Sequence, residues 1–389
     1  MEAINHESRK HSLLSASGSD RWMSCTPSAR KEEFIPNTES SYALEGTLAH
    51  ELSELELNKY FNNLDANQYN LRLEEIENNE FYASDMPENV DVYVSYCIER
   101  VNYYKSICKH VEISIEEKVD LTAYIPEGFG SNDFVIIADG FIEVIDLKYG
   151  RGVPVSAVNN SQLKLYGLGS VYKHELSYQT SEVTLVIVQP RIDNISTFTL
   201  SVIDLQEWAD TEVVTKAKMA FAGEGELNPG NWCKFCKFKP KCKAVHDQNM
   251  ALVKEDFSDI DSLSEDEILN IFEKSTQITN WVNSINAYVM DKLLKKEEVK
   301  GYKLVKGRST RKFNDTEKVK EILKEKYNSN DYLTEPKLLG ITAIEKLVGK
   351  KQLPELLGNY IEKTEPKPSI ALLEDRRLNF FDSAETDFL

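Results

Sequence analysis

Three closely spaced cysteines form the most specific chemical pattern in this sequence. Cys233, Cys236 and Cys242 lie within the segment WCKFCKFKPKC. Thiolates this close together suggest a metal site, and Cys25, far upstream, is the candidate for a fourth ligand. Four thiolates could hold Zn²⁺ or an iron–sulfur cluster. Either group would tie the N-terminus to the far end of the same domain.

Two carboxylates meet in a predicted β-hairpin. Asp139-Gly140 separates the apolar runs 134–137 and 141–147, and such a pair is a strong signal for a two-residue turn. With this turn, Asp133 faces Asp146, and directly opposed side chains lie about 4.5–5.5 Å apart. Lys148 follows Asp146 at i+2, so it projects on the same face.

This grouping could support metal-assisted chemistry. Carboxylate oxygens suit Mg²⁺ or Mn²⁺, and a bound divalent ion can polarise a phosphoryl oxygen and lower the pKa of its water. Lys148 could orient that water, and His50 could add an imidazole ligand. Gly46, one helical turn before His50, would let its helix approach another backbone or a substrate closely. The alternatives are a strand end with ordinary charges and a structural histidine.

The elements that must position these residues form a mixed α/β unit over residues 1–246. Helices are predicted over 44–61, 90–110, 161–172 and 205–222, and strands over 111–119, 134–137, 141–147, 182–190 and 197–203. We predict a linker at 247–262. A mainly helical domain is predicted over 263–389, from a capping box at 264–267, a long apolar stripe at 278–293 and the helical patterns 316–327 and 343–357.

Composition and charge limit the classes of function. The 389 residues are 41% hydrophobic, enough for a core of ordinary size. The net charge of −18 argues against a protein that coats nucleic acid or membrane with its whole surface. Acids outnumber bases by 14 between residues 32 and 99, whereas 231–243 and 300–312 contain bases and no acid. Such runs are usually solvated faces, but these two could also form a local DNA path.

The location follows from what the sequence lacks. No run of 18 apolar residues could span a membrane, and the first residues contain no signal-peptide stretch. Six cysteines are too few for a disulfide scaffold. We therefore expect a cytoplasmic protein that has no membrane partner.

The order of the motifs resembles that of the PD-(D/E)XK nuclease superfamily, in its RecB-like exonuclease branch. The motifs are G-x-x-x-H (Gly46, His50), an acid (Asp133), D-x-K (Asp146, Lys148) and Q-x-x-x-Y (Gln162, Tyr166). The cysteines resemble those of its iron–sulfur members, the Cas4-like proteins. EGTLAHEL, IVQPR and GYKLVKGRSTRK are similar to the DUF2800 family of phage and prophage proteins. The sequence departs from the superfamily pattern in having Asp146 where Glu is commoner and no proline before Asp133.

This resemblance implies a restriction-endonuclease-like core, a mixed central sheet flanked by helices, with an iron–sulfur staple and an α-rich C-terminal domain. It implies that His50, Asp133, Asp146 and the Leu147 carbonyl hold Mg²⁺ or Mn²⁺ and that Lys148 is the catalytic lysine. Gln162 and Tyr166 would position DNA. Cys25, Cys233, Cys236 and Cys242 would ligate a [4Fe–4S] cluster, with Zn²⁺ as the alternative.

The function implied is a metal-dependent DNA exonuclease of phage origin, acting 5′→3′ on single-stranded ends in recombination or replication in a bacterial host cell. The alternative is a catalytically silent DNA-binding or scaffold subunit of a phage recombination complex, and the chain could form a homo-oligomer. Further candidate DNA contacts are Arg151, Lys234, Lys237, Lys303, Lys306, Arg308 and Arg311. A surface role is the alternative for Arg151.

Overall fold

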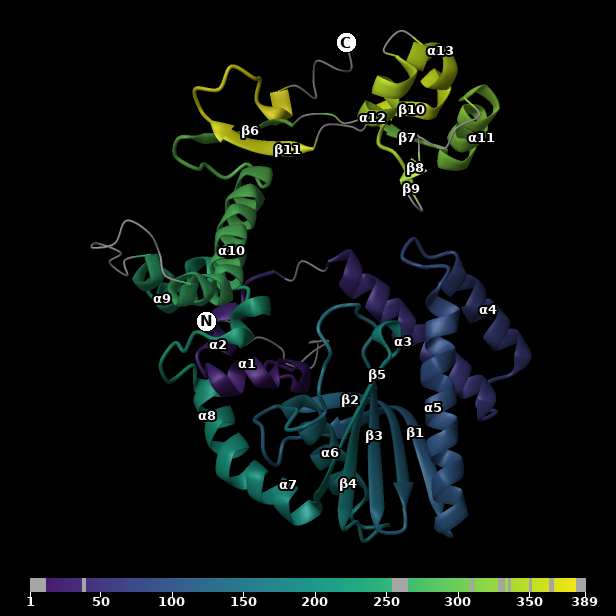
Figure 1. Cartoon of the computed structure of the whole chain (residues 1–389). Coiled ribbons are helices and arrows are strands. Elements are labelled where there is room, and N and C mark those ends of the chain that lie inside the picture. Colours follow the sequence, from purple (N-terminus) through teal and green to yellow (C-terminus); the bar gives the residue numbers. More distant parts are fainter. Residues whose placement is uncertain are drawn as a thin grey trace. The chain divides into compact units, whose positions relative to one another are not determined.

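The computed structural model divides the chain into two compact units, residues 1–273 and 274–389 (Figure 1). It describes residues 12–36, 40–253, 265–307, 309, 311–327, 333–334, 337–349, 352–363 and 367–382. None of the helices in these ranges has the length and apolar character that crossing a bilayer requires.

A five-stranded mixed sheet forms the centre of the first unit. Its strands, in spatial order, are β1 (Val111–Asp120), β2 (Phe129–Ala138), β3 (Phe141–Leu147), β4 (Glu182–Gln189) and β5 (Asn194–Ser201). Only β3 and β4 pair in parallel. The β2–β3 ladder pairs Ala138 with Phe141 and Val135 with Val144, and Gly140 has a φ of 87°. The turn and register predicted for this hairpin are therefore confirmed.

Helices cover both faces of this sheet (Figure 1). One face packs against α3 (Ser41–Tyr60), α4 (Ala66–Glu77) and α5 (Met86–Ile107). The other packs against α1 (Ser19–Ser24), α6 (Ser161–His174), α7 (Val202–Trp208) and α8 (Val214–Ala222). The first unit also contains α2 (Ser28–Glu32) and α9 (Lys243–Val253). The expected mixed α/β class, with a central mixed sheet between helices, is confirmed.

The helix α6 makes the crossover that parallel β3 and β4 require. The side chain of Asn160 caps its N-terminus by accepting a hydrogen bond from the Leu163 N–H. Gly167 and Gly169 let α6 lie close to the sheet. A Cβ atom on Gly169 would come within 2.7 Å of Val119, and one on Gly167 within 2.9 Å of Val183. This close packing holds α6 against the strands that carry the candidate site.

Three predicted segments differ in detail. The helix predicted at 205–222 contains a π-helical turn at Ala209–Val213, between α7 and α8. The pattern at 343–357 forms two helices, because Gly349, with a φ of 95°, ends the first of them. The predicted linker, 247–262, is helical up to Val253, and its residues 254–262 lie outside the described residues. The division between the units falls instead within α10.

The second unit combines helices with short strand pairs that the sequence patterns did not indicate. Its helices are α10 (Glu265–Leu294, which begins in the first unit), α11 (Thr316–Tyr327), α12 (Ile341–Val348) and α13 (Gln352–Leu357). Its strand pairs are β6 (Tyr302–Lys306) with β11 (Pro368–Leu372), β7 (Arg311–Phe313) with β10 (Ile361–Lys363), and β8 (Leu333–Thr334) with β9 (Lys337–Leu338). The basic segment 300–312 is thus divided between two different sheets.

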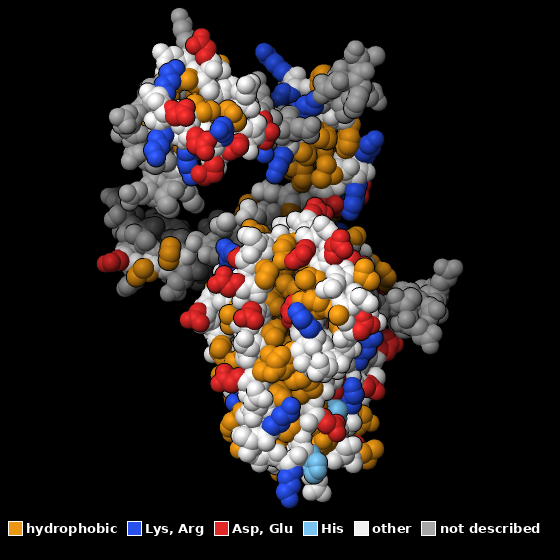
Figure 2. All heavy atoms as spheres, turned by 90° about the vertical axis from the view of Figure 1, so that its right-hand side faces the viewer, with side chains coloured by type: hydrophobic (Ala, Val, Ile, Leu, Met, Phe, Trp, Pro, Cys, Tyr) orange, Lys and Arg blue, Asp and Glu red, His pale blue; other side chains and the backbone are white. Residues whose placement is uncertain are grey.

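The acidic stretch 32–99 contributes α3, α4 and most of α5. Figure 2 shows the side of the first unit on which α4 and α5 lie, where acidic side chains stand among apolar and basic ones. Arg72, for example, bonds to Glu51 at 2.9 Å and to Glu75 at 2.7 Å. This side carries dispersed acidic charge rather than one continuous acidic surface.

A buried ion pair fixes α5 to β3. Arg100 donates to both carboxylate oxygens of Glu143, at 2.7 and 2.6 Å, and the Tyr104 hydroxyl donates at 2.9 Å. Glu143 is fully buried. We predict that Arg100→Ala lowers the free energy of unfolding by about 3–5 kcal/mol, because it leaves a buried carboxylate without its counter-ion.

Urea denaturation of the unmodified protein and of Arg100→Ala measures this loss of stability. The matched control is Arg72→Ala, which removes an arginine that is half exposed. It should cost less than about 1 kcal/mol. Equal losses in both variants would contradict the role assigned to Arg100.

Candidate active site

Three carboxylates lie side by side on adjacent strands. The β1–β2 ladder pairs Ile115 with Phe134 and Glu117 with Asn132, which places Glu116 opposite Asp133. The β2–β3 ladder ends at Phe134 and Ile145, and one further step places Asp133 opposite Asp146. Like charges at such positions destabilise a sheet unless cations compensate them. The site therefore requires positive charge nearby.

The strands are irregular where these acids lie. Glu116 has a φ of 49°, in the left-handed region that a non-glycine residue rarely adopts. On β2, Val135 packs in the core on the α6 side, and Asn132 also bonds to Ser170 of α6, at 2.8 Å. Strict alternation would place residues 132 and 135 on opposite faces. The break falls next to Asp133, and backbone strain of this kind is concentrated at functional sites.

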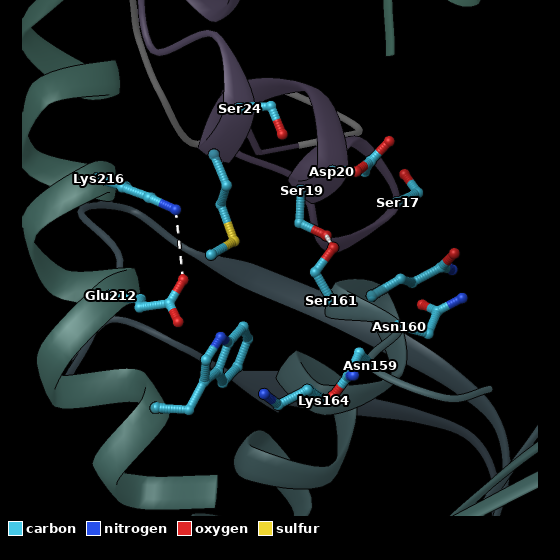
Figure 3. A pocket seen from close by; sticks show the side chains of 13 residues that line it. Ser17, Ser19, Asp20, Ser24, Asn159, Asn160, Ser161, Lys164, Glu212 and Lys216 are labelled. Atoms are coloured by element: carbon cyan, nitrogen blue, oxygen red, sulfur yellow. Dashed lines mark hydrogen bonds and ion pairs between the residues drawn. The ribbon is translucent and has the colours of Figure 1, made fainter. Parts of the chain in front are cut away.

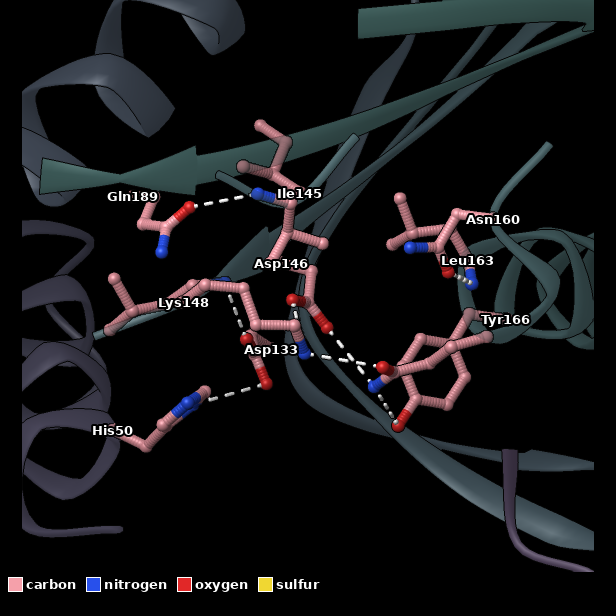
Figure 4. A network of polar contacts seen from close by, with 12 residues as sticks. His50, Asp133, Ile145, Asp146, Lys148, Asn160, Leu163, Tyr166 and Gln189 are labelled. Atoms are coloured by element: carbon pink, nitrogen blue, oxygen red, sulfur yellow. Dashed lines mark hydrogen bonds and ion pairs between the residues drawn. The ribbon is translucent and has the colours of Figure 1, made fainter. Parts of the chain in front are cut away.

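His50, on α3, supplies one compensating group (Figure 4). Its Nδ1 lies 3.3 Å from Asp133 Oδ1, while the Leu147 N–H donates to Asp133 Oδ2 at 2.7 Å. Burial, the largest single cause, would lower the pKa of His50, but the charge and hydrogen bond of Asp133, together with the Asp146 charge, raise that pKa to about 9. Burial would likewise raise the pKa of Asp133, but His50, Lys148 and the Leu147 N–H together lower that pKa.

His50, Glu116 and Asp133 could share a metal ion. One ligand atom from each lies within 4.8 Å of the others, and within the described residues no other such group of three is found. Burial, reinforced by the Asp133 charge, raises the pKa of Glu116 to about 7. One imidazole and two carboxylates are donors that fit Mg²⁺ or Mn²⁺. The predicted ligand Asp146 lies beside this trio rather than within it.

Sequence reasoning missed Glu116. It lies in a run that alternates poorly, and β1 reaches β2 through the connection 121–128, which is too long to fix the register as a two-residue turn does. The acid-rich pattern at 116–117 was the only available signal, and it does not distinguish Glu116 from its neighbour. Glu117 instead forms a buried network with Ser170 at 2.8 Å and His174 at 2.7 Å.

Lys148 compensates the third carboxylate. Its Nζ lies 2.8 Å from Asp146 Oδ2 and donates to Gln162 Oε1 at 3.2 Å. Burial raises the pKa of Asp146, and Lys148 opposes this only in part. Burial would lower the pKa of Lys148, but Asp146 outweighs it and raises that pKa. Lys148 is therefore a fixed cation at neutral pH.

The Q-x-x-x-Y residues join the same network from α6 (Figure 4). Gln162 Nε2 donates to Asp146 Oδ1 at 3.4 Å and to the Tyr166 hydroxyl at 3.2 Å. Burial raises the pKa of Tyr166, so its hydroxyl keeps its proton. The structure thus brings together six of the predicted residues, His50, Asp133, Asp146, Lys148, Gln162 and Tyr166, and places the Leu147 backbone beside Asp133.

Within the described ranges, the structure does not show the close approach of another backbone that was expected at Gly46. A Cβ atom at Gly46 would have nothing within 4 Å among the described residues, so no backbone packs closely against α3 at this point. Only the second part of that expectation, a close approach by a substrate, stays a prediction.

Most candidate DNA contacts already bond within the protein. Arg151 pairs with Asp85, and Arg311 with Glu345 at 2.6 Å. Lys303 donates to the Asp375 carbonyl at 2.8 Å, Lys237 donates to the Ile35 carbonyl at 3.5 Å, and Lys234 lies over the Phe235 ring. Lys306 lies in β6, and Arg308 lies outside the described residues. The two arginines are therefore already paired with acids of the protein, and the role of all these residues in DNA binding stays a prediction.

Cys25, Cys233, Cys236 and Cys242 line one small cavity, together with apolar side chains such as Leu227 and Val245. The N–H groups of Asn228 and Gly230 point at the sulfurs of Cys25 and Cys233, both at 3.5 Å. No three of these sulfurs lie mutually within 4.8 Å. A single zinc ion with ~2.3 Å bonds would hold them closer, at ~3.8 Å. The donor types fit a thiolate-bound metal, but their spacing is not that of a zinc cage.

Comparison with known proteins places the chain in a family. A family model described as "Protein of unknown function (DUF2800)" matches residues 11–378. The chain belongs to the DUF2800 family. The resemblance to DUF2800 noted in the sequence is thereby confirmed, but the description of that family names no activity. Among solved structures, the chain is similar to one titled "Crystal structure of SSO0001", with 15% identity over 56% of this chain and 95% of that chain. The TM-score of 0.26 is too low to support an argument.

Metal binding should release a proton from His50. At pH 8 its imidazole, with a pKa of about 9, is mostly protonated and must lose that proton to become a ligand. We predict that Mn²⁺ affinity rises up to about tenfold per pH unit between pH 8 and 9 and levels off above that. Calorimetry at pH 8 in two buffers of different ionisation enthalpy should show about one proton released.

His50→Gln should bind Mn²⁺ more weakly, without this pH dependence. The matched control is His110→Gln, which removes an exposed histidine whose Nδ1 lies 3.4 Å from Asp139. It should leave both affinity and proton release unchanged. A pH-independent affinity in the unmodified protein would contradict the assignment of His50.

Proposed function

We propose that this protein is a metal-dependent deoxyribonuclease that hydrolyses phosphodiester bonds at DNA ends. One observation carries the proposal: two carboxylates and an imidazole spaced to share a metal adjoin a fixed lysine. His50, Glu116 and Asp133 form the metal group, and Lys148 is held on Asp146 beside it. In the hydrolysis of a phosphodiester, a metal can activate the attacking water and a lysine can stabilise the charge that develops on the phosphate. The motif order of RecB-like nucleases supports DNA as the substrate.

Each residue would then have a defined role. His50, Glu116 and Asp133, with Asp146 beside them, would hold Mg²⁺ or Mn²⁺, which supplies an activated water and stabilises phosphoryl charge when bound. Lys148 would orient the attacking water and stabilise the charge that develops on the phosphate. Gln162 holds Lys148 and Asp146 in register through hydrogen bonds at 3.2 and 3.4 Å. It is a positioning residue.

Removing the lysine charge should abolish most cleavage. We predict that Lys148→Ala lowers the rate on DNA by about 100- to 1,000-fold, as loss of one preorganised donor does in other enzymes. A time course with 5′- and 3′-labelled single-stranded and duplex DNA, with Mg²⁺ or Mn²⁺, measures the rate and shows the polarity.

The control is Lys118→Ala, which removes an exposed lysine of β1, and its rate should match that of the unmodified protein. If neither Mg²⁺ nor Mn²⁺ supports cleavage by the unmodified protein above the level seen with Lys148→Ala, the proposed function is overturned. Tight DNA binding without turnover would instead indicate a DNA-binding subunit of a phage recombination or replication complex.

We also propose that the four cysteines hold a [4Fe–4S] cluster. The four cysteines line one cavity, and this supports the proposal. Burial raises the pKa of the Cys236 thiol to about 12, so only a bound metal would make it a thiolate at neutral pH. Such a group would join the end of α1 to the segment 233–242. Hydrogen bonds from Thr26 to the Glu224 carbonyl and from Arg30 to the Phe221 carbonyl, both 2.6 Å, already tie the neighbouring segment to the end of α8.

Cluster binding can be tested by colour and metal content. Protein purified without oxygen should be brown and contain about four iron atoms per chain. Cys236→Ser should lose the iron, whereas Cys108→Ser, outside the cavity, should keep it. A colourless, folded protein, with or without one equivalent of zinc, would overturn the cluster.

A further inference from the structure

A second cavity, of about 610 Å³, lies at the N-terminal end of α6, between α1 and the α7–α8 segment (Figure 3). Ser19, Ser161, Gln162, Lys164 and Trp208 are among the residues that line it. Gln162 also bonds to Asp146 and Lys148. The cavity therefore borders the candidate active site through a residue that belongs to both.

Lys164 is a buried cation without a counter-ion. Its side chain is only 8% exposed, and its Nζ lies 3.8 Å from the centroid of the Trp208 ring. Within the part of the chain that the structure describes, this Nζ makes no hydrogen bond or ion pair. Burial lowers the pKa of Lys164, and the charge of Glu212 only partly opposes this. Its ammonium lines the cavity, so its three donors are available to a ligand bound there.

The helix terminus beside it presents further donors. The Asn160 side chain accepts from Leu163 N at 3.2 Å, and the Asn160 carbonyl accepts from Lys164 N at 3.0 Å. The N–H groups of Ser161 and Gln162 have no partner within the helix because of their position. Ser19 and Ser161 add hydroxyls, which bond to each other at 2.7 Å. The positive end of a helix dipole favours an anion with several acceptor oxygens.

The acids that line this cavity restrict where such an anion could bind. Glu212 bonds to Lys216 at 3.3 Å, and Asp20 is exposed at the other rim. The lining is therefore not uniformly positive. This pattern favours one anionic group held at Lys164 over a polyanion spread along the whole cavity.

We propose that this cavity binds a phosphate of the DNA strand next to the phosphate that is cleaved, with Lys164 as its main ligand. The identity of the ligand rests on the proposed function. Gln162 lines the cavity and also bonds to Asp146 and Lys148, so a strand with its scissile phosphate at Lys148 would continue past Gln162 towards the α6 terminus. Lys164 would thereby fix the position of the strand relative to the metal group.

Salt-dependent binding tests this without cleavage. The full-length protein, in EDTA, is titrated with a labelled single-stranded oligonucleotide at several salt concentrations, and anisotropy gives the affinity. Lys164→Met should keep the packing against Trp208 yet lower the salt slope of log K by about 0.7, the value for one lost phosphate contact. The matched control is Lys173→Met, a lysine near the other end of α6 that pairs with Glu117 at 3.3 Å. It should leave the slope unchanged.

If Lys164→Met does not fold, chemical footprinting of lysines in the unmodified protein tests the same proposal. The oligonucleotide should protect Lys164 from an acylating reagent, as read by mass spectrometry, and inorganic phosphate should compete with the oligonucleotide for the site. An unchanged slope in folded Lys164→Met, or acylation of Lys164 unaffected by the oligonucleotide, would overturn the proposal. Cleavage is measured separately: Lys164-dependent binding without hydrolysis would refute only the proposed function.

Discussion

Mutual repulsion between three carboxylates on adjacent strands is the constraint on which the first unit depends. Glu116, Asp133 and Asp146 cannot all be charged at this spacing unless cations lie against them. His50 approaches Asp133 from α3, and Lys148 approaches Asp146 from the end of β3. The pKa of Asp133 is lowered and that of Asp146 is raised, because nearby positive charge offsets the burial of Asp133 fully and the burial of Asp146 only in part. A divalent ion would complete the neutralisation and displace the proton of His50.

The apolar scaffold makes these charges effective. The strands β2 and β3, which carry Asp133 and Asp146, are covered on both faces, by α3 to α5 on one side and α6 to α8 on the other. Little water enters such a core, so each pairwise interaction is stronger than it would be at the surface. The same burial means that a charged side chain displaced from its partner would strongly destabilise the fold. The glycines of α6 and the Arg100–Glu143 pair therefore serve the site by holding α6 and α5 at fixed distances from the sheet.

The parts of this arrangement that the sequence predicts are those set by local signals. Asp139-Gly140 fixes the register of one hairpin, and with it the pairing of Asp133 with Asp146. Glu116 could not be found in this way, because its pairing with β2 spans a long connection and its left-handed φ breaks the alternation. The basic segment 300–312 shows that a local signal can also mislead. Its charges are adjacent in sequence, but Arg311 and Lys312 pair with Glu345 and Glu362, which only the fold brings near.

Net charge is consequently a poor guide to where DNA could bind this protein. Arg311, for example, is neutralised by Glu345, although it occurs in a segment that looks basic. Lys164 occurs in no basic run, yet within the described residues it has neither ion pair nor hydrogen bond. Affinity for a phosphate depends on the cation's partners in the free protein, because an existing ion pair must first be broken. The net charge of −18 therefore does not argue against the proposed phosphate site at Lys164, because that site depends on one local cation rather than on the total charge.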